Sequence, residues 1–150
     1  VDTVYQCSST ATDCDLHRPD GLAFGPDGLL YVTSFRRDAS DIDRILIFDV
    51  TNTEDPLVDS IDLGGTGDER AFAQGLLFGP DGLYVPISGG GPAYSGSVRI
   101  YDVTTELEPE PYTVFVPATS AGGPLVNPRY LTFGQTDPAT LAYEGKKQCQ

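Results

Sequence analysis

The chain has 150 residues, which is enough for one domain with a hydrophobic core. Its 22 acidic and 9 basic residues give a formal net charge of −13, and such a surface repels nucleic acid and anionic membranes. No apolar run approaches the roughly 20 residues that a membrane-spanning helix needs. We therefore expect no nucleic-acid partner and no membrane span.

The first segment, residues 1–17, is expected to hold one strand and one disulfide loop. Residues 2–7 read as a strand with no hairpin partner before it. Cys7 and Cys14 bracket a loop rich in Ser and Thr, and their spacing suits a short disulfide worth roughly 2–3 kcal/mol. The same spacing fits no common zinc site. We expect a Cys7–Cys14 disulfide and hence a secreted or cell-surface protein.

The next segment, residues 18–63, is expected to form four antiparallel strands. Residues 22–32 read as a hairpin, because apolar residues alternate with small or polar ones on either side of the Gly-Pro-Asp-Gly sequence at 25–28. In such a turn, Pro presets φ and Gly accepts a positive φ. Residues 44–50 and 57–63 supply the third and fourth strands.

An insertion at residues 36–43 separates the second and third strands of this repeat. Its carboxylates are hard oxygen donors that suit calcium, although the spacing is not that of an EF-hand. The alternative is a solvated loop in which the carboxylates balance the neighbouring arginines. The calcium candidates are Asp38, Asp41 and Asp43, and the arginines are Arg36, Arg37 and Arg44.

The same pattern returns in residues 64–116. Residues 75–85 restate residues 21–32, about 54 residues further on, and residues 97–103 answer the earlier strand at 44–50. A last strand, at residues 112–116, closes this second repeat.

A matching insertion, residues 88–96, places Tyr94 in a glycine-rich loop. The two insertions fall at the same point of the repeat, so we expect them on one rim, where repeat proteins usually bind. Arg36, Arg37 and Tyr94 are the binding candidates on this rim. Tyr94 either stacks on a sugar or a partner or is a plain exposed aromatic, and both readings stay open.

Residues 117–150 are expected to form part of a third repeat, in which residues 128–137 are a degraded copy of the hairpin. Four strands per repeat, at a period slightly above 50, describe a propeller blade. A complete propeller usually has four to eight blades. We therefore expect an all-β fold of four-stranded antiparallel blades that make an incomplete propeller. The side chains expected between the blades are Leu22, Phe24, Ile45, Ile47, Leu76, Phe78, Ile100 and Phe133.

The segment PDGLAFGPDGLLYVTS, followed by RILIFDV, resembles the blades of NHL-type, YVTN-type and SMP-30/gluconolactonase-like β-propellers, over roughly residues 18–143. The SMP-30-like lactonases hold a divalent metal in the central channel with Glu, Asn and Asp side chains. The corresponding positions here are Asp20, Gln74, Asn127 and Arg129. Asn127 matches that ligand set, whereas Gln74 and Arg129 do not. The resemblance therefore implies the fold and does not carry the activity.

No catalytic residue is expected, because His17 is the one histidine and no nucleophile motif such as G-x-S-x-G accompanies it. The first hypothesis is a non-catalytic extracellular module that acts by binding or self-assembly. The alternative is part of a metal-dependent SMP-30/lactonase-like hydrolase that is complete only with additional blades.

Both ends of the chain are expected to present strand edges, because the strand at residues 2–7 has no partner and the third repeat lacks its outer strand. Strand addition between protomers would satisfy both edges and give a closed propeller or a filament. Missing blades in a longer chain would leave the same edges. Cys149 has no partner left in the chain, and in a protomer assembly it would lie near the partner's N-terminal strand, where an intermolecular disulfide would form.

Overall fold

The computed structural model describes residues 3, 5–6, 14–64, 70–89, 96–103, 112–132 and 134. These residues form eight strands and one short 3-10 helix, η1 (Thr119–Ala121). The strands are β1 (Pro19–Phe24), β2 (Leu30–Ser34), β3 (Arg44–Phe48), β4 (Leu57–Asp62), β5 (Leu77–Gly79), β6 (Gly82–Ile87), β7 (Ser97–Tyr101) and β8 (Tyr112–Val116).

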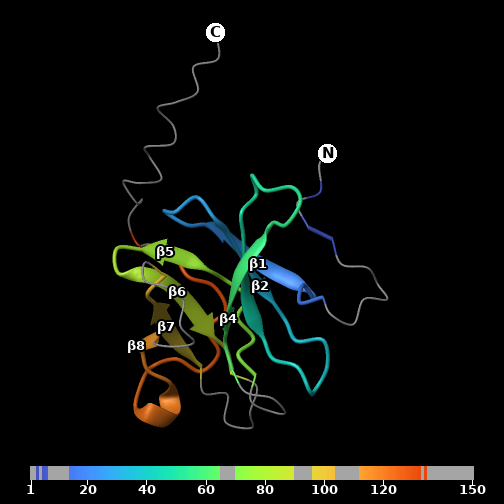
Figure 1. The fold of residues 1–150 in the computed structure, drawn as a ribbon. Helices are drawn as coiled ribbons and strands as arrows, with labels where there is room; N and C mark the ends of the chain where they lie inside the picture. Colours follow the sequence, from blue (N-terminus) through green and yellow to red (C-terminus); the bar gives the residue numbers. More distant parts are fainter. Residues whose placement is uncertain are drawn as a thin grey trace.

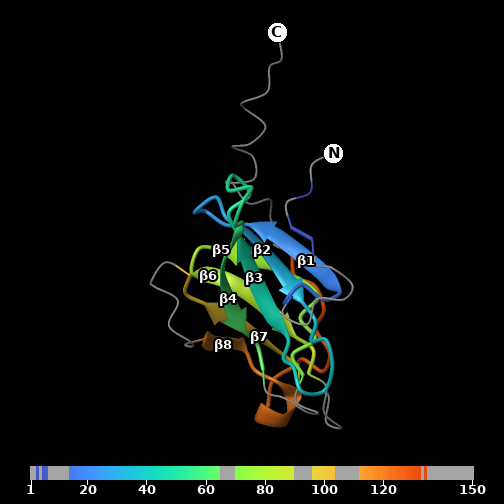
Figure 2. The same ribbon diagram turned by 45° about the vertical axis from the view of Figure 1, so that its right-hand side comes forward.

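The strands form two four-stranded antiparallel sheets (Figures 1 and 2). The first sheet has the order β1-β2-β3-β4 and the second the order β5-β6-β7-β8, so each strand pairs with the next one along the chain. The predicted all-β class, with four antiparallel strands in each of the first two repeats, is confirmed. No helix in the described part of the chain is long and apolar enough to cross a membrane.

The predicted Gly-Pro-Asp-Gly turn joins β1 to β2. The Gly28 amide donates to the Gly25 carbonyl at 3.0 Å, and the Asp27 carboxylate accepts from the Leu29 amide at 3.0 Å. Gly28 has a φ of 85°, and Gly82, at the matching point of the second repeat, has a φ of 133°. Because these angles favour glycine, the turn chemistry predicts both hairpins correctly.

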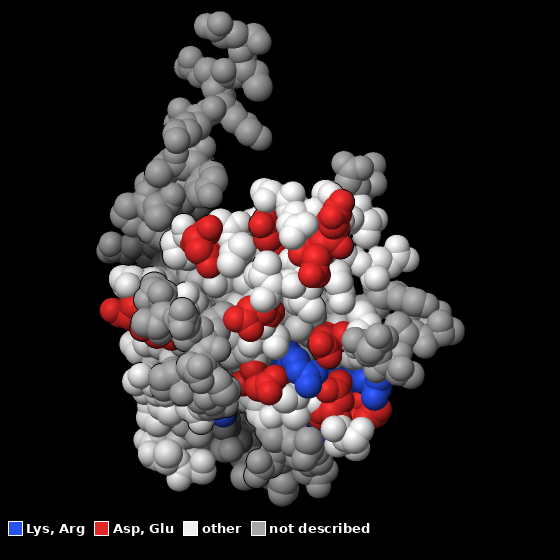
Figure 3. Space-filling view, viewed as in Figure 1, with Lys and Arg blue, Asp and Glu red and all other residues white. Residues whose placement is uncertain are grey.

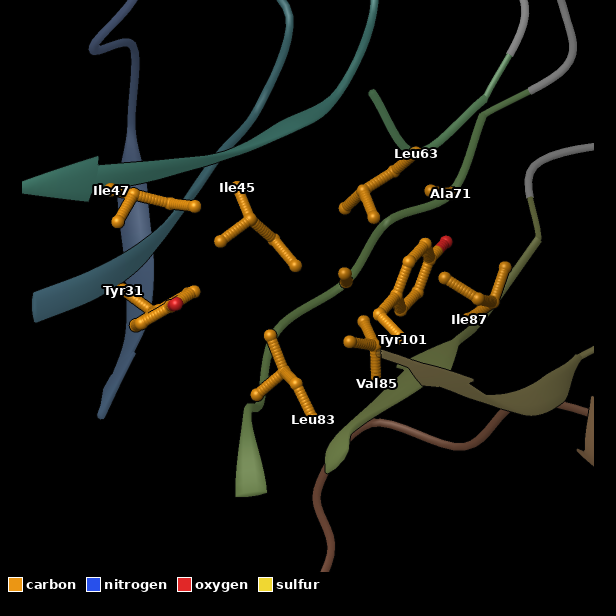
Figure 4. Packing of buried hydrophobic residues seen from close by; sticks show 10 residues of the cluster. Tyr31, Ile45, Ile47, Leu63, Ala71, Leu83, Val85, Ile87 and Tyr101 are labelled. Atoms are coloured by element: carbon orange, nitrogen blue, oxygen red, sulfur yellow. The ribbon is translucent and has the colours of Figure 1, made fainter. Parts of the chain in front are cut away.

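The main core lies between the two sheets (Figure 4). The first sheet contributes Tyr31, Ile45 and Ile47, which are almost fully buried. The chain between the sheets and the second sheet contribute the other buried members: Leu63, Ala71, Ala73, Leu83, Val85, Ile87 and Tyr101. Burying side chains of this size is worth about 1.5–3 kcal/mol each, which makes this contact the main source of stability.

The predicted burial of Leu22 and Phe24 is wrong. Their side chains are 66% and 56% exposed, whereas Ile45 and Ile47 are buried as expected. Leu22 and Phe24 pair with Val32 and Leu30 and so lie on the outer face of the first sheet, the face turned away from the second sheet.

The other predicted core residues differ in how far they are buried. Leu76, Phe78 and Ile100 are partly buried, and Phe133 lies outside the described residues. A second, smaller cluster of Val32, Leu46 and Phe48 occupies the outer face.

The N-terminal segment covers part of this outer face. Tyr5 and Leu16 pack against the smaller cluster, and the Tyr5 ring lies 5.1 Å from the Phe48 ring. Residues 3, 5 and 6 belong to no strand, and the rest of the strand predicted at residues 2–7 lies outside the described part of the chain.

Candidate functional site

The first strands of successive repeats lie side by side, because a glycine permits the close approach. β1 contacts β5, and a Cβ added at Gly21 would lie 2.4 Å from the Gln74 carbonyl oxygen. Gly75 holds the matching position, and a Cβ there would lie 3.0 Å from the Arg129 carbonyl oxygen. The same backbone contact therefore recurs between the second repeat and the segment at Arg129, although residues 128–132, predicted to begin a third repeat, form no strand.

This contact involves three of the four positions that the resemblance placed in a central channel, whereas the fourth, Asn127, is exposed and takes no part in it. The Gln74 side-chain amide donates to the Asp20 carboxylate at 2.9 Å, and Arg129 follows at the next repeat. Asp20 and Arg129 are exposed. These three residues hold matching positions of the repeat, and we call the group the inner edge. Such a group can bind a polar ligand but is a poor donor set for a divalent metal.

The backbone conformation just before the first strand is also the same in the two repeats. Arg18 and Phe72, 54 residues apart, have φ values of 44° and 48°. Positive φ is uncommon for residues other than glycine, so the surrounding contacts must hold this conformation. The Arg18 guanidinium donates to the Arg36 carbonyl, and the Phe72 amide donates to the Asp43 carboxylate at 3.1 Å.

Asp43 is the most heavily bonded of the predicted site residues. Its side chain is 1% exposed and forms an ion pair with Arg70 at 2.6 Å. It also accepts from the backbone amides of Arg36 at 2.9 Å, Ala71 at 3.0 Å and Phe72 at 3.1 Å. Burial would raise the pKa of Asp43, but the hydrogen bonds from Arg70 and these amides outweigh it and lower the pKa. Asp43 thus ties the insertion of the first repeat to the start of the second.

Arg70 is held on its other side by aromatic rings. Its guanidinium carbon lies 3.8 Å from the centroid of the Phe72 ring and 5.8 Å from that of Phe35. Cation–π contacts and a buried carboxylate together fix the guanidinium. Sequence reasoning missed this group because the partners are 27 residues apart and Arg70 follows an uninformative glycine-rich connector.

The other two calcium candidates have protein partners of their own. Asp41 accepts from the Arg37 amide and pairs with Arg44, both at 2.8 Å. Asp38 accepts from the Ser40 hydroxyl at 2.6 Å, and this bond, the Ser40 amide and Arg37 lower its pKa to about 2. Among the described residues, no three His, Cys, Asp or Glu side chains are grouped to hold a metal ion. This arrangement gives no support to calcium.

The predicted rim arginines Arg36 and Arg37, and the neighbouring Arg44, take part in the same network, Arg36 through its backbone amide, which donates to Asp43. Arg37 pairs with Asp38 at 3.1 Å, and Arg44 contacts Asp41, Asp62 and Asp15 at 2.8, 3.1 and 3.6 Å. Figure 3 shows the few basic side chains of this face lying among acidic ones. The loop therefore matches the alternative reading, in which its charges balance one another.

The remaining predicted site residues are the three cysteines and Tyr94. Cys14 is buried and disulfide-bonded, and its sulfur lies 3.9 Å from the Tyr5 hydroxyl oxygen. Cys7, Cys149 and Tyr94 lie outside the described residues. The Cys7–Cys14 pairing and the roles of Cys149 and Tyr94 therefore stay predictions.

A tyrosine–aspartate pair recurs in both sheets and was not predicted. The Tyr31 hydroxyl donates to Asp27, and the Tyr84 hydroxyl donates to Asp81, both at 2.9 Å. Burial, together with the neighbouring aspartate, raises the pKa of each tyrosine. The two tyrosines hold the same position of the repeat, so the pairs mark equivalent faces of the two sheets.

No family model, curated protein or solved structure matches this chain.

Proposed function

We propose that this chain is a non-catalytic, extracellular β-propeller-like module that acts by binding or self-assembly. The observation that carries the proposal is the way the two sheets stack. The face of the first sheet that carries Tyr31 packs against the opposite face of the second sheet, which carries Phe78. The centroids of these two rings are 4.9 Å apart. Stacking of this kind leaves one unused face at each end of the stack.

The inner edge supports a radial arrangement of the repeats. First strands that lie side by side, each separated from the next by a glycine contact, resemble the inner strands of propeller blades. The two sheets would then be blades that continue around an axis near Asp20 and Gln74.

The extracellular setting is proposed from the cysteines. A disulfide at Cys14 is typical of secreted and cell-surface proteins, and a net charge of −13 favours a soluble, mutually repelling surface. Strand addition through residues 2–7 remains part of the proposal, although most of that strand lies outside the described residues.

The lactonase alternative would need carboxylate and amide ligands around a metal. At the inner edge the Asp20 carboxylate already accepts from the Gln74 amide, and the Arg129 guanidinium cannot ligate a metal, so we favour the non-catalytic function. Stoichiometric divalent metal in the purified protein, together with lactone turnover, would reverse this choice.

The proposal is tested by the native mass of the chain in solution. Sedimentation velocity over a range of protein concentrations, with and without reductant, should show species heavier than one protomer. A mass that stays at one protomer under all conditions would rule out self-assembly and leave binding to another molecule. A loss of the heavier species on reduction would show that a disulfide supports the contact.

A further inference from the structure

The outer face of the first sheet presents large apolar side chains to solvent. Leu22 and Phe24 are mostly exposed, and Leu30, Val32 and Phe48 lie beside them on the same face. Tyr5 and Leu16 cover the part of this face near Phe48. Adjacent exposed apolar side chains of this size are typical of an interaction surface.

The outer face repeats the surface by which the second sheet docks on the first. Phe24 holds the position of Phe78, Leu30 that of Leu83 and Phe48 that of Tyr101. In the second sheet these three residues pack into the main core against the first sheet. The packing of the second sheet on the first therefore indicates which kind of surface the outer face can bind.

The accepted surface is the one around Tyr31, Ile45 and Ile47, which receives Phe78. Its counterpart in the second sheet is the far face, the side turned away from the first sheet, with Tyr84, Val98 and Ile100 at the matching positions. The bond between Tyr84 and Asp81 matches that between Tyr31 and Asp27. The far face therefore has the kind of surface against which Phe78 packs within the chain. The outer face has no such surface packed against it.

Much of the far face is already covered, and Tyr84 and Val98 are only 9% and 2% exposed. Ser88 bonds to the Pro128 carbonyl, and the Gly96 amide donates to the Val126 carbonyl at 3.1 Å, so the segment after β8 covers this end. The β8 side is open: Phe115 is 57% exposed and meets the Tyr84 ring edge-on at 5.2 Å. Phe115 is therefore the accessible aromatic of this face.

We propose that the outer face docks a second copy of this chain, with Phe24 of one copy seated against Phe115, the exposed ring beside Tyr84, of the other. The inference rests on the proposed self-assembly and names its surfaces. A second copy is the occupant because this contact continues, between chains, the sheet-to-sheet interface that already exists within each chain. The two surfaces differ, so the contact is head to tail, and it closes into a ring or propagates.

Charge sets how this contact depends on salt. Each copy carries a net charge of −13, and acidic side chains are spread over the face shown in Figure 3. Repulsion between copies is screened as ionic strength rises, whereas an apolar contact is not weakened by it. Association should therefore strengthen between about 0.05 and 0.5 M salt.

The test uses two single variants of the full chain, Phe24→Asp and Phe115→Asp, studied alone and mixed. Both side chains are more than half exposed, so the fold should survive, as far-UV circular dichroism and thermal unfolding would verify. Each variant alone should raise the dissociation constant at least about tenfold, as expected for an aromatic anchor. Ala121→Asp in η1 adds the same charge at an exposed position and should assemble like the wild type.

The equimolar mixture is the decisive sample. One intact outer face and one intact far face remain in each mixed pair, so the mixture should form a dimer and no larger species. A mixture that stays monomeric, or a Phe115→Asp variant that assembles normally, would overturn the head-to-tail contact. If Phe24→Asp assembles as well as the wild type does, the outer face is not the contact surface, although self-assembly itself stands. A wild type that is monomeric at every concentration and salt would overturn both.

Discussion

At the residue scale, the buried ion pair of Asp43 and Arg70 joins the two repeats. We expect Asp43→Asn to lower the free energy of unfolding by about 3–5 kcal/mol, because it leaves the buried Arg70 guanidinium without its counter-charge. Denaturant unfolding measures this loss. Asp62→Asn is the matched control, since Asp62 meets Arg44 at an exposed site and should cost less than about 1 kcal/mol. Equal losses in the two variants would show that Asp43 is not the tie between the repeats.

The same carboxylate predicts a pH dependence. Because the pKa of Asp43 is lowered in the folded protein, its ionised form stabilises the fold above the ordinary carboxyl pKa of 3.8. This contribution disappears as the pH falls through the lower folded value, and Asp38, with a pKa of about 2, has the same sign. We expect the free energy of unfolding to fall between about pH 4 and pH 2, and to fall less steeply in Asp43→Asn. Parallel curves for the two proteins would contradict this assignment.

At the element scale, β1 and β5 carry the same motif in different surroundings. Phe78 packs against the main core and lies edge-on to Tyr31, so we expect Phe78→Ala to cost about 3 kcal/mol. Phe24→Ala removes the same side chain at the same repeat position, but Phe24 is mostly exposed and its loss should cost less than about 1 kcal/mol in the dilute monomer. Thermal or denaturant unfolding at low concentration compares the two. Similar costs would mean that the sheets stack through other faces.

The contact between first strands makes a separate prediction. A methyl group at Gly21 would collide with the backbone of Gln74, which cannot rotate away, so Gly21→Ala should cost about 1–3 kcal/mol. At Gly134, no atom of the described residues lies within 4 Å of an added Cβ, and Gly134→Ala should be close to neutral. Unfolding midpoints of the two variants measure the difference. A neutral Gly21→Ala would show that the first strands are not in tight contact.

At the scale of the whole molecule, the disulfide at Cys14 fastens the N-terminal segment beside the outer face. We expect peptide mapping without reduction to give one cross-linked peptide that contains Cys7 and Cys14. Reduction should lower the free energy of unfolding by roughly 2–3 kcal/mol, as loop closure predicts. A cross-link from Cys14 to Cys149 instead would join the two ends of the chain and contradict the predicted pairing.

The sequence by itself determined the features that depend on neighbouring residues. The Gly-Pro-Asp-Gly turn, the alternation of the strands and the repeat of about 54 residues predict two four-stranded antiparallel sheets, since turn geometry and strand pairing are local properties. The charge-balanced loop at residues 36–43 was foreseen as one of two alternatives for the same reason, because its arginines and aspartates are close in sequence.

Only the tertiary structure decided which face of each strand is buried. Leu22 and Phe24 have the same local sequence as Leu76 and Phe78, yet they are exposed because no other sheet among the described strands lies over them. The pairing of Asp43 with Arg70 could not be predicted from the sequence either, since it joins residues 27 positions apart. Burial and long-range ion pairs depend on what another part of the chain, or another chain, places against a surface, and a local pattern does not carry that information.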